Sequence, residues 1–329
     1  MLKHWTPAQL GALRRIRERF LEGTAGEKDY WQSPEDLALY DATFAERIGW
    51  KWDAVLDELQ RRGWQPRSKR ILDWGCGSGI AHRRILAAWP QFEALALHDR
   101  SALARDFAAR QAREKFPDLQ ISTSAPTANE ETLILLSHVI SELPPPELDR
   151  LLDLARGAGE VIWVEAGTHV DSRRLIAVRE RLRDTFSIVA PCTHQQPCGM
   201  LTSENASHWC HHFSHPPSTI FQDAGWMEFG REMGIDLRSL PYSFLVLAKH
   251  PTPTPAGYSR VIGDPREAKG FMRVLSCQSS GVADLILQKR DEPSLFKAMQ
   301  KGRSEPVYRW TLENGKIVEA QPWPGTHAD

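Results

Sequence analysis

Apolar residues at helical spacing fill the first sixty positions of the chain. Thr6 precedes a first run as a helix cap, and a second run starts at Ser33 and continues to Arg62, where Gly63 is a helix stop. The apolar face of the first run consists of Leu10, Leu13, Ile16, Phe20 and Leu21. Residues 1–62 therefore predict a helical extension ahead of the main domain, with no catalytic features.

From residue 70 onward, short apolar strands alternate with helical patterns. We expect strands at 71–74, 92–98, 119–123, 132–137 and 160–164, and helices at 81–89, 101–115, 146–156 and 173–186. Strands that alternate with helices build a parallel sheet covered by helices. The pattern predicts an α/β fold with a doubly wound, Rossmann-like sheet.

The alternation breaks at Ala190. Residues 190–217 are rich in Pro, Cys and His and have no usable period, so we expect a long irregular insertion there. Strand signals return at 227–230 and 242–248, and these would complete the sheet. The main domain is therefore expected to span residues 63–250.

Three prolines in five positions follow the last strand of this domain. They predict a linker at 251–255. Further strand patterns follow at 258–262, 271–276 and 283–289. The sequence thus predicts a small β-rich C-terminal unit over residues 251–329.

Composition and charge exclude two classes of protein. The longest all-apolar stretches, such as Leu133–Leu136, are far shorter than the ~18 residues of a membrane span, so no membrane protein is expected. The 329 residues contain five cysteines and begin without a secretory pattern, which argues against a disulfide-rich secreted protein. The expected compartment is the bacterial cytoplasm, with the mitochondrial matrix as the alternative.

The charges give no global attraction to nucleic acid. The 41 basic and 42 acidic residues leave a net charge of −1, so any RNA contact has to come from a local patch. Residues 260–319 carry eleven Lys or Arg against eight Asp or Glu. This excess is a hint of an RNA-binding face in the C-terminal unit, and a mixed solvated surface explains it equally well.

A glycine-rich turn follows the strand at 71–74. Gly75, Gly77 and Gly79 permit a tight turn and a close approach to a ligand, and Asp73 precedes them. The spacing differs from the dinucleotide fingerprint G-x-G-x-x-G, and no Lys-Ser/Thr pair follows as in a phosphate loop. Asp99 ends the next strand, where a carboxylate can accept hydrogen bonds from ribose hydroxyls.

This arrangement resembles motif I of the class I S-adenosylmethionine-dependent methyltransferases. By that resemblance, Asp73 would orient the methionine end of S-adenosylmethionine and Gly75, Gly77 and Gly79 would line the cofactor. Asp99 would hold the ribose. The alternative is a fold of this class whose cofactor site is empty or put to another use.

Candidate catalytic residues follow the strand at 132–137. The stretch after this strand lacks the Asn/Asp-Pro-Pro-aromatic tetrapeptide of enzymes that methylate exocyclic amines. His138 and Glu142 could act as a general base, or they could be ordinary polar residues at a strand end and a helix start. Catalytic activity is therefore left open by the sequence.

Four cysteines lie outside the glycine turn. Cys192, Cys198 and Cys210 fall within nineteen residues, and Cys277 follows in the C-terminal unit. The short C-x₂-C pairs of zinc sites are absent, and four widely spaced thiolates suit a [4Fe–4S] cluster. Two alternatives are isolated structural thiols and a Cys₃His zinc site that uses a neighbouring histidine: His194, His208, His211, His212 or His215.

The combined motifs resemble those of the Rsm22 family of ribosomal small-subunit methyltransferase-like proteins. The shared features are motif I, Glu165-Ala166-Gly167-Thr168 after the fifth strand, P-C-x-x-x-x-P-C at 191–198 and W-C-H-H-F at 209–213. The resemblance implies that a [4Fe–4S] cluster is bound by Cys192, Cys198, Cys210 and Cys277.

The same resemblance implies a partner and a function. The protein would bind S-adenosylmethionine and associate with the small ribosomal subunit or its precursor and with rRNA. It would act there as an rRNA methyltransferase or as an assembly factor. The alternative function is that of a zinc-containing methyltransferase acting on a protein or a small molecule.

Overall fold

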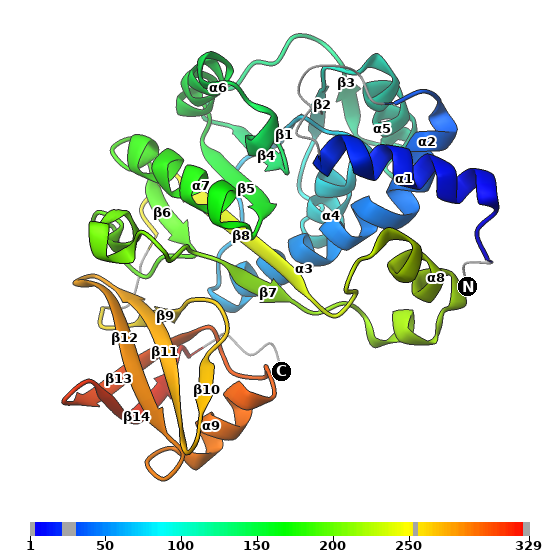
Figure 1. The fold of residues 1–329 in the computed structure, drawn as a ribbon. Helices are drawn as coiled ribbons and strands as arrows, with labels where there is room; N and C mark the ends of the chain where they lie inside the picture. The colour runs from blue at the N-terminus through cyan, green and yellow to red at the C-terminus, as the bar shows by residue number, and fades with distance from the viewer. Residues whose placement is uncertain (1–3, 22–30, 253–255, 325–329) are drawn as a thin grey trace. The chain divides into compact units, whose positions relative to one another are not determined.

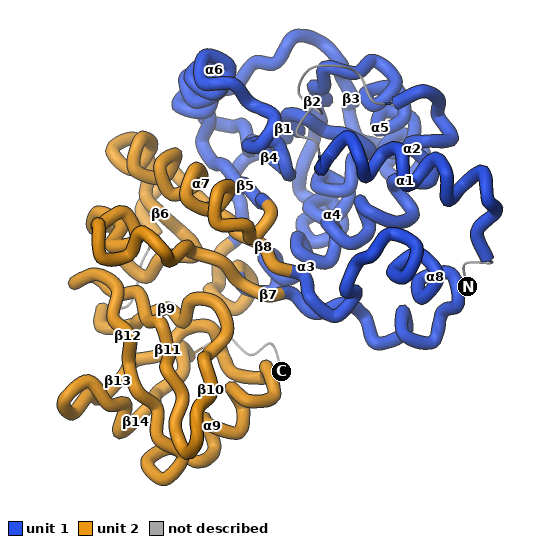
Figure 2. Tube along the Cα trace, viewed as in Figure 1, with its two compact units in different colours: residues 1–58, 65–165, 214–240 blue, residues 59–64, 166–213, 241–329 orange. Residues whose placement is uncertain are grey.

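The computed structural model describes residues 4–21, 31–252 and 256–324. The chain divides into two compact units, each assembled from separate segments (Figure 2). Unit 1 comprises residues 1–58, 65–165 and 214–240, and unit 2 comprises residues 59–64, 166–213 and 241–329. No helix among the described residues is long and apolar enough to cross a membrane.

The predicted helical extension is present. It consists of α1 (Pro7–Leu21), α2 (Pro34–Tyr40), a π-helical turn at 41–45 and α3 (Glu46–Arg61). Thr6 Oγ1 accepts the Gln9 backbone N–H at 3.3 Å, which caps α1. Leu21 was expected on the buried face but is 69% exposed, because it follows Ile16 by five positions and so lies about 140° round the helix from it.

A parallel sheet forms the centre of unit 1 (Figure 1). Its strands are β1 (Arg70–Trp74), β2 (Ala94–His98), β3 (Gln120–Ser122), β4 (Thr132–Ser137) and β5 (Glu160–Ala166), in the order β3-β2-β1-β4-β5. The connecting helices are α4 (Ile80–Ala88), α5 (Ala102–Lys115) and α6 (Pro145–Gly157). This arrangement confirms the α/β fold with a doubly wound, Rossmann-like sheet.

The strand order reverses between β1 and β4. From β1 the chain continues to β2 and β3 on one side, and it then returns to β4 and β5 on the other. In open α/β sheets, ligands bind at the carboxyl ends of the strands where the order reverses. We therefore expect a cofactor site to be formed by the residues that follow β1 and β4.

The expected strand at 227–230 is wrong. These residues belong to α8 (Ala224–Met233), which begins where Asp223 Oδ1 accepts the Trp226 N–H and ends at Gly234, with a φ of +59°. Trp226, Phe229 and Met233 share one helical face and pack in a buried cluster with α1. The apolar residues therefore follow the period of a helix, which a four-residue window cannot distinguish from a strand.

Unit 2 contains the antiparallel strands expected to complete the sheet. After α7 (His169–Leu182), strand β6 (Ser187–Ala190) pairs antiparallel with β8 (Leu240–Ala248). The expected strand at 242–248 is confirmed as part of β8. Between them, the Cys- and His-rich insertion is irregular apart from 3₁₀ turns and the short strand β7 (His212–Ser214), which pairs with β8.

The predicted β-rich C-terminal unit is also present. It contains β9 (Ser259–Val261), β10 (Arg266–Ala268), β11 (Phe271–Gln278), β12 (Gly281–Gln288), α9 (Pro293–Gln300), β13 (Val307–Glu313) and β14 (Lys316–Pro322). The sheet closes on itself, because β9 pairs with both β11 and β13. Its interior is a buried cluster that includes Val274, Leu287 and Ile317. The sequence missed β10, α9, β13 and β14.

Candidate cofactor site and cysteine cluster

The glycine turn after β1 adopts a conformation that requires glycine. Gly75, Gly77 and Gly79 have φ values of +72°, +51° and +88°. A Cβ at position 75 would lie 2.6 Å from Val139 Cγ1, so the turn packs directly against the segment after β4. A Cβ at position 77 would meet no atom within 4 Å. The turn is therefore tightly held on one side and leaves space next to Gly77.

The structure brings Asp99 and the glycine turn together. Asp99 Oδ2 accepts the Gly77 N–H at 2.9 Å, and its Oδ1 accepts the Ser101 N–H at 2.8 Å. Burial raises the pKa of Asp99. The carboxylate at the end of β2 thus lies at the open side of the turn, where a ribose could reach it.

Asp73 lies beneath the turn and is fully buried. Its Oδ2 is 2.7 Å from Nδ1 of His82, which is also fully buried. Its Oδ1 has no hydrogen-bond partner among the residues that the structure describes. An unpaired buried carboxylate oxygen is costly and suits a ligand that brings a donor, such as the ammonium group of S-adenosylmethionine. The sequence did not predict His82, because no motif in the helix that carries it marks it as a partner of Asp73.

His138 follows β4 at the same edge of the sheet. It has a φ of +56°, which is unusual for a residue other than glycine, and its Nε2 is 3.4 Å from Lys51 Nζ. Burial and the positive charge of Lys51 hold the pKa of His138 well below its usual value. His138 is therefore a neutral imidazole and a weak proton acceptor.

Glu142 is a stronger candidate for a base. Burial raises its pKa to about 7, although Arg100 opposes the shift. The pKa of Tyr40 is raised by burial and by the negative charges of Glu142, Asp41 and Asp99. Tyr40, Asp99 and Glu142 therefore influence one another at this edge, and Tyr40, which comes from the helical extension, was not expected from the sequence.

Glu165, the first residue of the motif expected after the fifth strand, lies within β5 and supports the segment that carries these residues. Its Oε1 accepts the backbone N–H groups of Val139 and Ile140 at 3.0 and 2.9 Å. The side chain is buried. Glu165 therefore fixes the turn between His138 and Glu142.

The four cysteines outside the glycine turn influence one another in unit 2. Burial raises the pKa of Cys277, and negative charge on Cys192, Cys210 or Cys198 would raise it further. The pKa of Cys198 is raised to about 11 by burial and by Cys192. Cys198, Cys210 and Cys277 also share an apolar cluster with Met200 and Ile262. Three segments of the insertion and strand β11 thus bring their thiols into one region.

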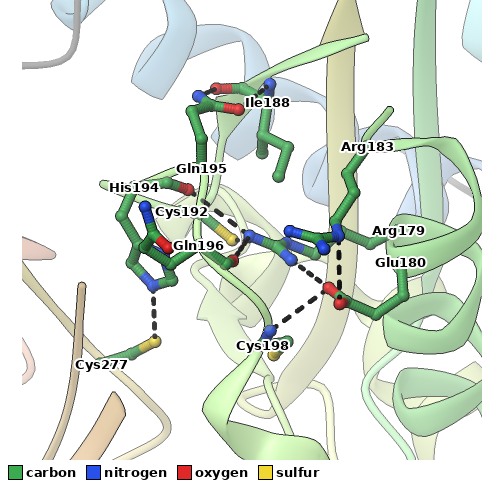
Figure 3. A network of polar contacts seen from close by, with 10 residues as sticks. All are labelled: Arg179, Glu180, Arg183, Ile188, Cys192, His194, Gln195, Gln196, Cys198 and Cys277. Atoms are coloured by element: carbon green, nitrogen blue, oxygen red, sulfur yellow. Dashed lines mark hydrogen bonds and ion pairs between the residues drawn. The ribbon is translucent and has the colours of Figure 1, made fainter. Parts of the chain in front are cut away.

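Arginine and histidine side chains lie next to these thiols, and Figure 3 shows Arg179 and His194 in the region of Cys192, Cys198 and Cys277. Arg179 Nε, from α7, donates to Cys192 Sγ at 3.3 Å, and Arg179 also pairs with Glu180. His194 Nε2 lies 3.6 Å from Cys277 Sγ (Figure 3). His212 Nε2 lies 3.7 Å from Cys210 Sγ. Both histidines are buried, whereas His215 is exposed.

The arrangement does not form a site for a single metal ion. Across residues 4–21, 31–252 and 256–324, no group of three or more His, Cys, Asp or Glu side chains is placed to hold one ion. The donor set still suits a larger group. A [4Fe–4S] cluster is held by four thiolates on separate irons, and Arg179 and Arg260 supply positive charge next to these thiols.

A family model matches most of the chain. The model described as "Mitochondrial small ribosomal subunit Rsm22" matches residues 42–304. This range includes the glycine turn, Asp99 and all four cysteines of the insertion and β11. No curated protein sequence matches the chain.

Several solved methyltransferase structures resemble the chain distantly. Magnesium protoporphyrin IX methyltransferase from Synechocystis PCC 6803, solved with bound SAM, is 13% identical, with a TM-score of 0.37 over 75% of this chain and 100% of its own. Mitomycin 7-O-methyltransferase is 13% identical, with a TM-score of 0.38 over 57% of this chain and 65% of its own. Likenesses at this level carry no argument about function, and the fold rests on the strand order described above.

Proposed function

Because the chain belongs to the Rsm22 family, we propose that it is an S-adenosylmethionine-binding protein that acts on the small ribosomal subunit or its precursor. The observation that carries the proposal is the glycine turn at the reversal of strand order, with Asp99 on its open side. In the proposed complex, Asp99 holds the ribose hydroxyls and the unpaired oxygen of Asp73 accepts the ammonium group. Gly75, Gly77 and Gly79 line the cofactor.

Two glycines permit a matched test of S-adenosylmethionine binding. Gly77 and Gly234 have φ values of +51° and +59°, and a Cβ at either position meets no atom within 4 Å. Gly77→Ala and Gly234→Ala should therefore lose a similar amount of stability, about 1 kcal/mol. We expect that Gly77→Ala weakens the binding of radiolabelled S-adenosylmethionine at least tenfold and that Gly234→Ala leaves it unchanged. Equal binding by both variants would contradict the proposed site.

The proposal includes a [4Fe–4S] cluster on Cys192, Cys198, Cys210 and Cys277. What supports it is the clustering of these partly or fully buried thiols, their mutual influence and the guanidinium of Arg179 beside Cys192. When bound, the cluster would supply a structural cross-link between the insertion and β11, a region with few regular hydrogen bonds of its own. A role in electron transfer is not part of the proposal.

Metal analysis of anaerobically purified protein tests the cluster. We expect iron and acid-labile sulfide in equal amounts, with little zinc, and a broad visible absorbance band. Cys192→Ser should lose the iron and become less stable. Cys76→Ser changes the one cysteine outside this group and should keep the iron. Stoichiometric zinc in place of iron would overturn this part of the proposal and favour a zinc-containing methyltransferase.

The proposed target is rRNA within the small subunit, and two roles fit it. As an rRNA methyltransferase, the protein would use Glu142 rather than His138 to accept a proton. The pKa of Glu142 is about 7, whereas the pKa of His138 lies well below its usual value, which makes His138 the weaker base. As an assembly factor, it would bind S-adenosylmethionine without transferring the methyl group. The family's description places its namesake in mitochondria, while the sequence favoured a bacterial cytoplasm; the proposed partner is a ribosomal small subunit in either compartment.

A further inference from the structure

The C-terminal strands have the connectivity of an oligonucleotide-binding barrel, the OB-fold. With β9, β11, β12, β13 and β14 counted as strands one to five, the pairings run one-two-three-five-four and return to one. Strands three and five, β12 and β14, are parallel, and the other pairs are antiparallel. Helix α9 lies between strands three and four. In an OB-fold, the face of strands two and three carries the ligand.

The side chains of β11 and β12 alternate between the interior and this face. Met272, Val274, Leu285 and Leu287 are buried in the interior cluster. The alternate positions therefore point to the ligand face, and the register pairs them across the two strands as Phe271 with Gln288, Arg273 with Ile286, Leu275 with Asp284, and Cys277 with Val282.

One end of this face is covered by the cysteine-rich insertion. Leu275 and Val282 pack against the cluster that contains Met200 and Cys277. A Cβ at Gly199 would lie only 3.0 Å from the Val282 backbone nitrogen, so the insertion lies directly on β12. A ligand on this face is therefore confined to the other end, around Phe271 and Gln288.

The uncovered end holds a basic cavity of about 580 Å³. It is lined by Lys269, Gly270, Phe271, Gln288, Lys289, Arg290 and Pro293. The side chains of Lys269 and Lys289 are exposed and have no ion-pair partner among the described residues. Arg290 Nε donates to Gln288 Oε1 at 3.0 Å and lies 3.4 Å from Asp291 Oδ1, so this cation is partly neutralised. Arg266 and Arg273 do not line the cavity, and both pair with Asp284, which the register places opposite Leu275.

We propose that this cavity binds single-stranded RNA, with a base stacked on Phe271 and the adjacent phosphates bound by Lys269, Lys289 and Arg290. A partly exposed aromatic ring that lines the cavity beside cations matches the two needs of a nucleic-acid strand, since its bases stack and its phosphates attract positive charge. An anionic peptide or polysaccharide would use the cations and leave the ring unused. The choice of RNA rests on the proposed function, but the cavity does not involve the cofactor site.

Fluorescence anisotropy of the full chain with a labelled twelve-nucleotide single-stranded RNA tests the inference. Phe271→Ala should weaken binding by about fivefold or more, the loss of one base stack. Phe271→Trp should retain binding because it retains the aromatic ring. The matched control is Phe221→Ala, which removes a ring that is 43% exposed in unit 1 and should have no effect.

The charges are tested by the salt dependence of binding. Lys269→Gln with Lys289→Gln should reduce the slope of log affinity against log salt by about 1 to 1.5, while Lys301→Gln, an exposed lysine outside the cavity, should not. If Phe271→Ala binds as well as the unchanged protein, or if heparin or polyglutamate binds as tightly as RNA, the inference is wrong. If RNA binds as described but small ribosomal subunits do not, the proposed function fails and the cavity assignment stands.

Discussion

At the scale of single residues, the surroundings of a side chain in the folded protein determine whether it can act as a base. The sequence placed His138 and Glu142 on equal terms, since both are polar and follow the same strand. The structure separates them: burial and the charge of Lys51 lower the pKa of His138, whereas burial raises the pKa of Glu142 to about 7. Neither effect could be predicted from the sequence, because Lys51 lies 87 positions from His138 and contacts it only after folding.

The raised pKa of Glu142 predicts a pH dependence of stability. Between its usual value of 4.5 and about 7, the folded protein keeps a proton on Glu142 that the unfolded chain has released. The free energy of unfolding therefore falls as the pH rises through this window, by about 3 kcal/mol. Glu142→Gln cannot ionise and should lack this fall. Urea unfolding at pH 5 and pH 8 measures it, and an identical decrease in both proteins would contradict the assignment.

At the scale of elements, the sequence predicted the strands and helices that have a clear hydrophobic period. It missed the strands that are defined by pairing with distant parts of the chain. Strand β4 was predicted at 132–137, because its short run of four aliphatic residues falls within the alternation of strands and helices, as is typical of a central strand of a parallel sheet. Strands β13 and β14 were missed, because exposed polar residues such as Arg309 and Glu319 obscure their alternation. Their pairing with β9 and β12 is what defines them.

Gly159, directly before β5, lies very close to the backbone of Glu130, which precedes β4. A Cβ at Gly159 would lie 2.1 Å from the backbone oxygen of Glu130, which is not free to move away. Gly159→Ala should therefore destabilise the protein by about 2–4 kcal/mol. Gly11→Ala, in α1 where a Cβ meets no atom within 4 Å, should instead gain about 0.5–1 kcal/mol. Thermal unfolding of the two variants measures the difference, and equal melting temperatures would contradict the close approach.

At the scale of the whole molecule, each compact unit combines segments that lie far apart in the sequence. The sequence suggested contiguous segments, yet unit 1 takes residues 214–240, which begin within the insertion, and unit 2 takes residues 59–64, which begin within the helical extension. The residues of the candidate cofactor site, Asp73 to Glu142, all lie in unit 1. The cysteine cluster and the basic cavity both lie in unit 2. Each unit can therefore be tested through its own variants.

The most direct test of the proposed function is sedimentation of the protein with purified small ribosomal subunits in the presence of S-adenosylmethionine labelled at its methyl group. We predict that the protein co-sediments with small subunits and not with large subunits. Labelled cofactor should co-sediment with the unchanged protein and not with Gly77→Ala. Label recovered covalently in rRNA would identify an enzyme, and label retained only on the protein would identify an assembly factor. A protein that stays in the supernatant with both kinds of subunit would contradict the account.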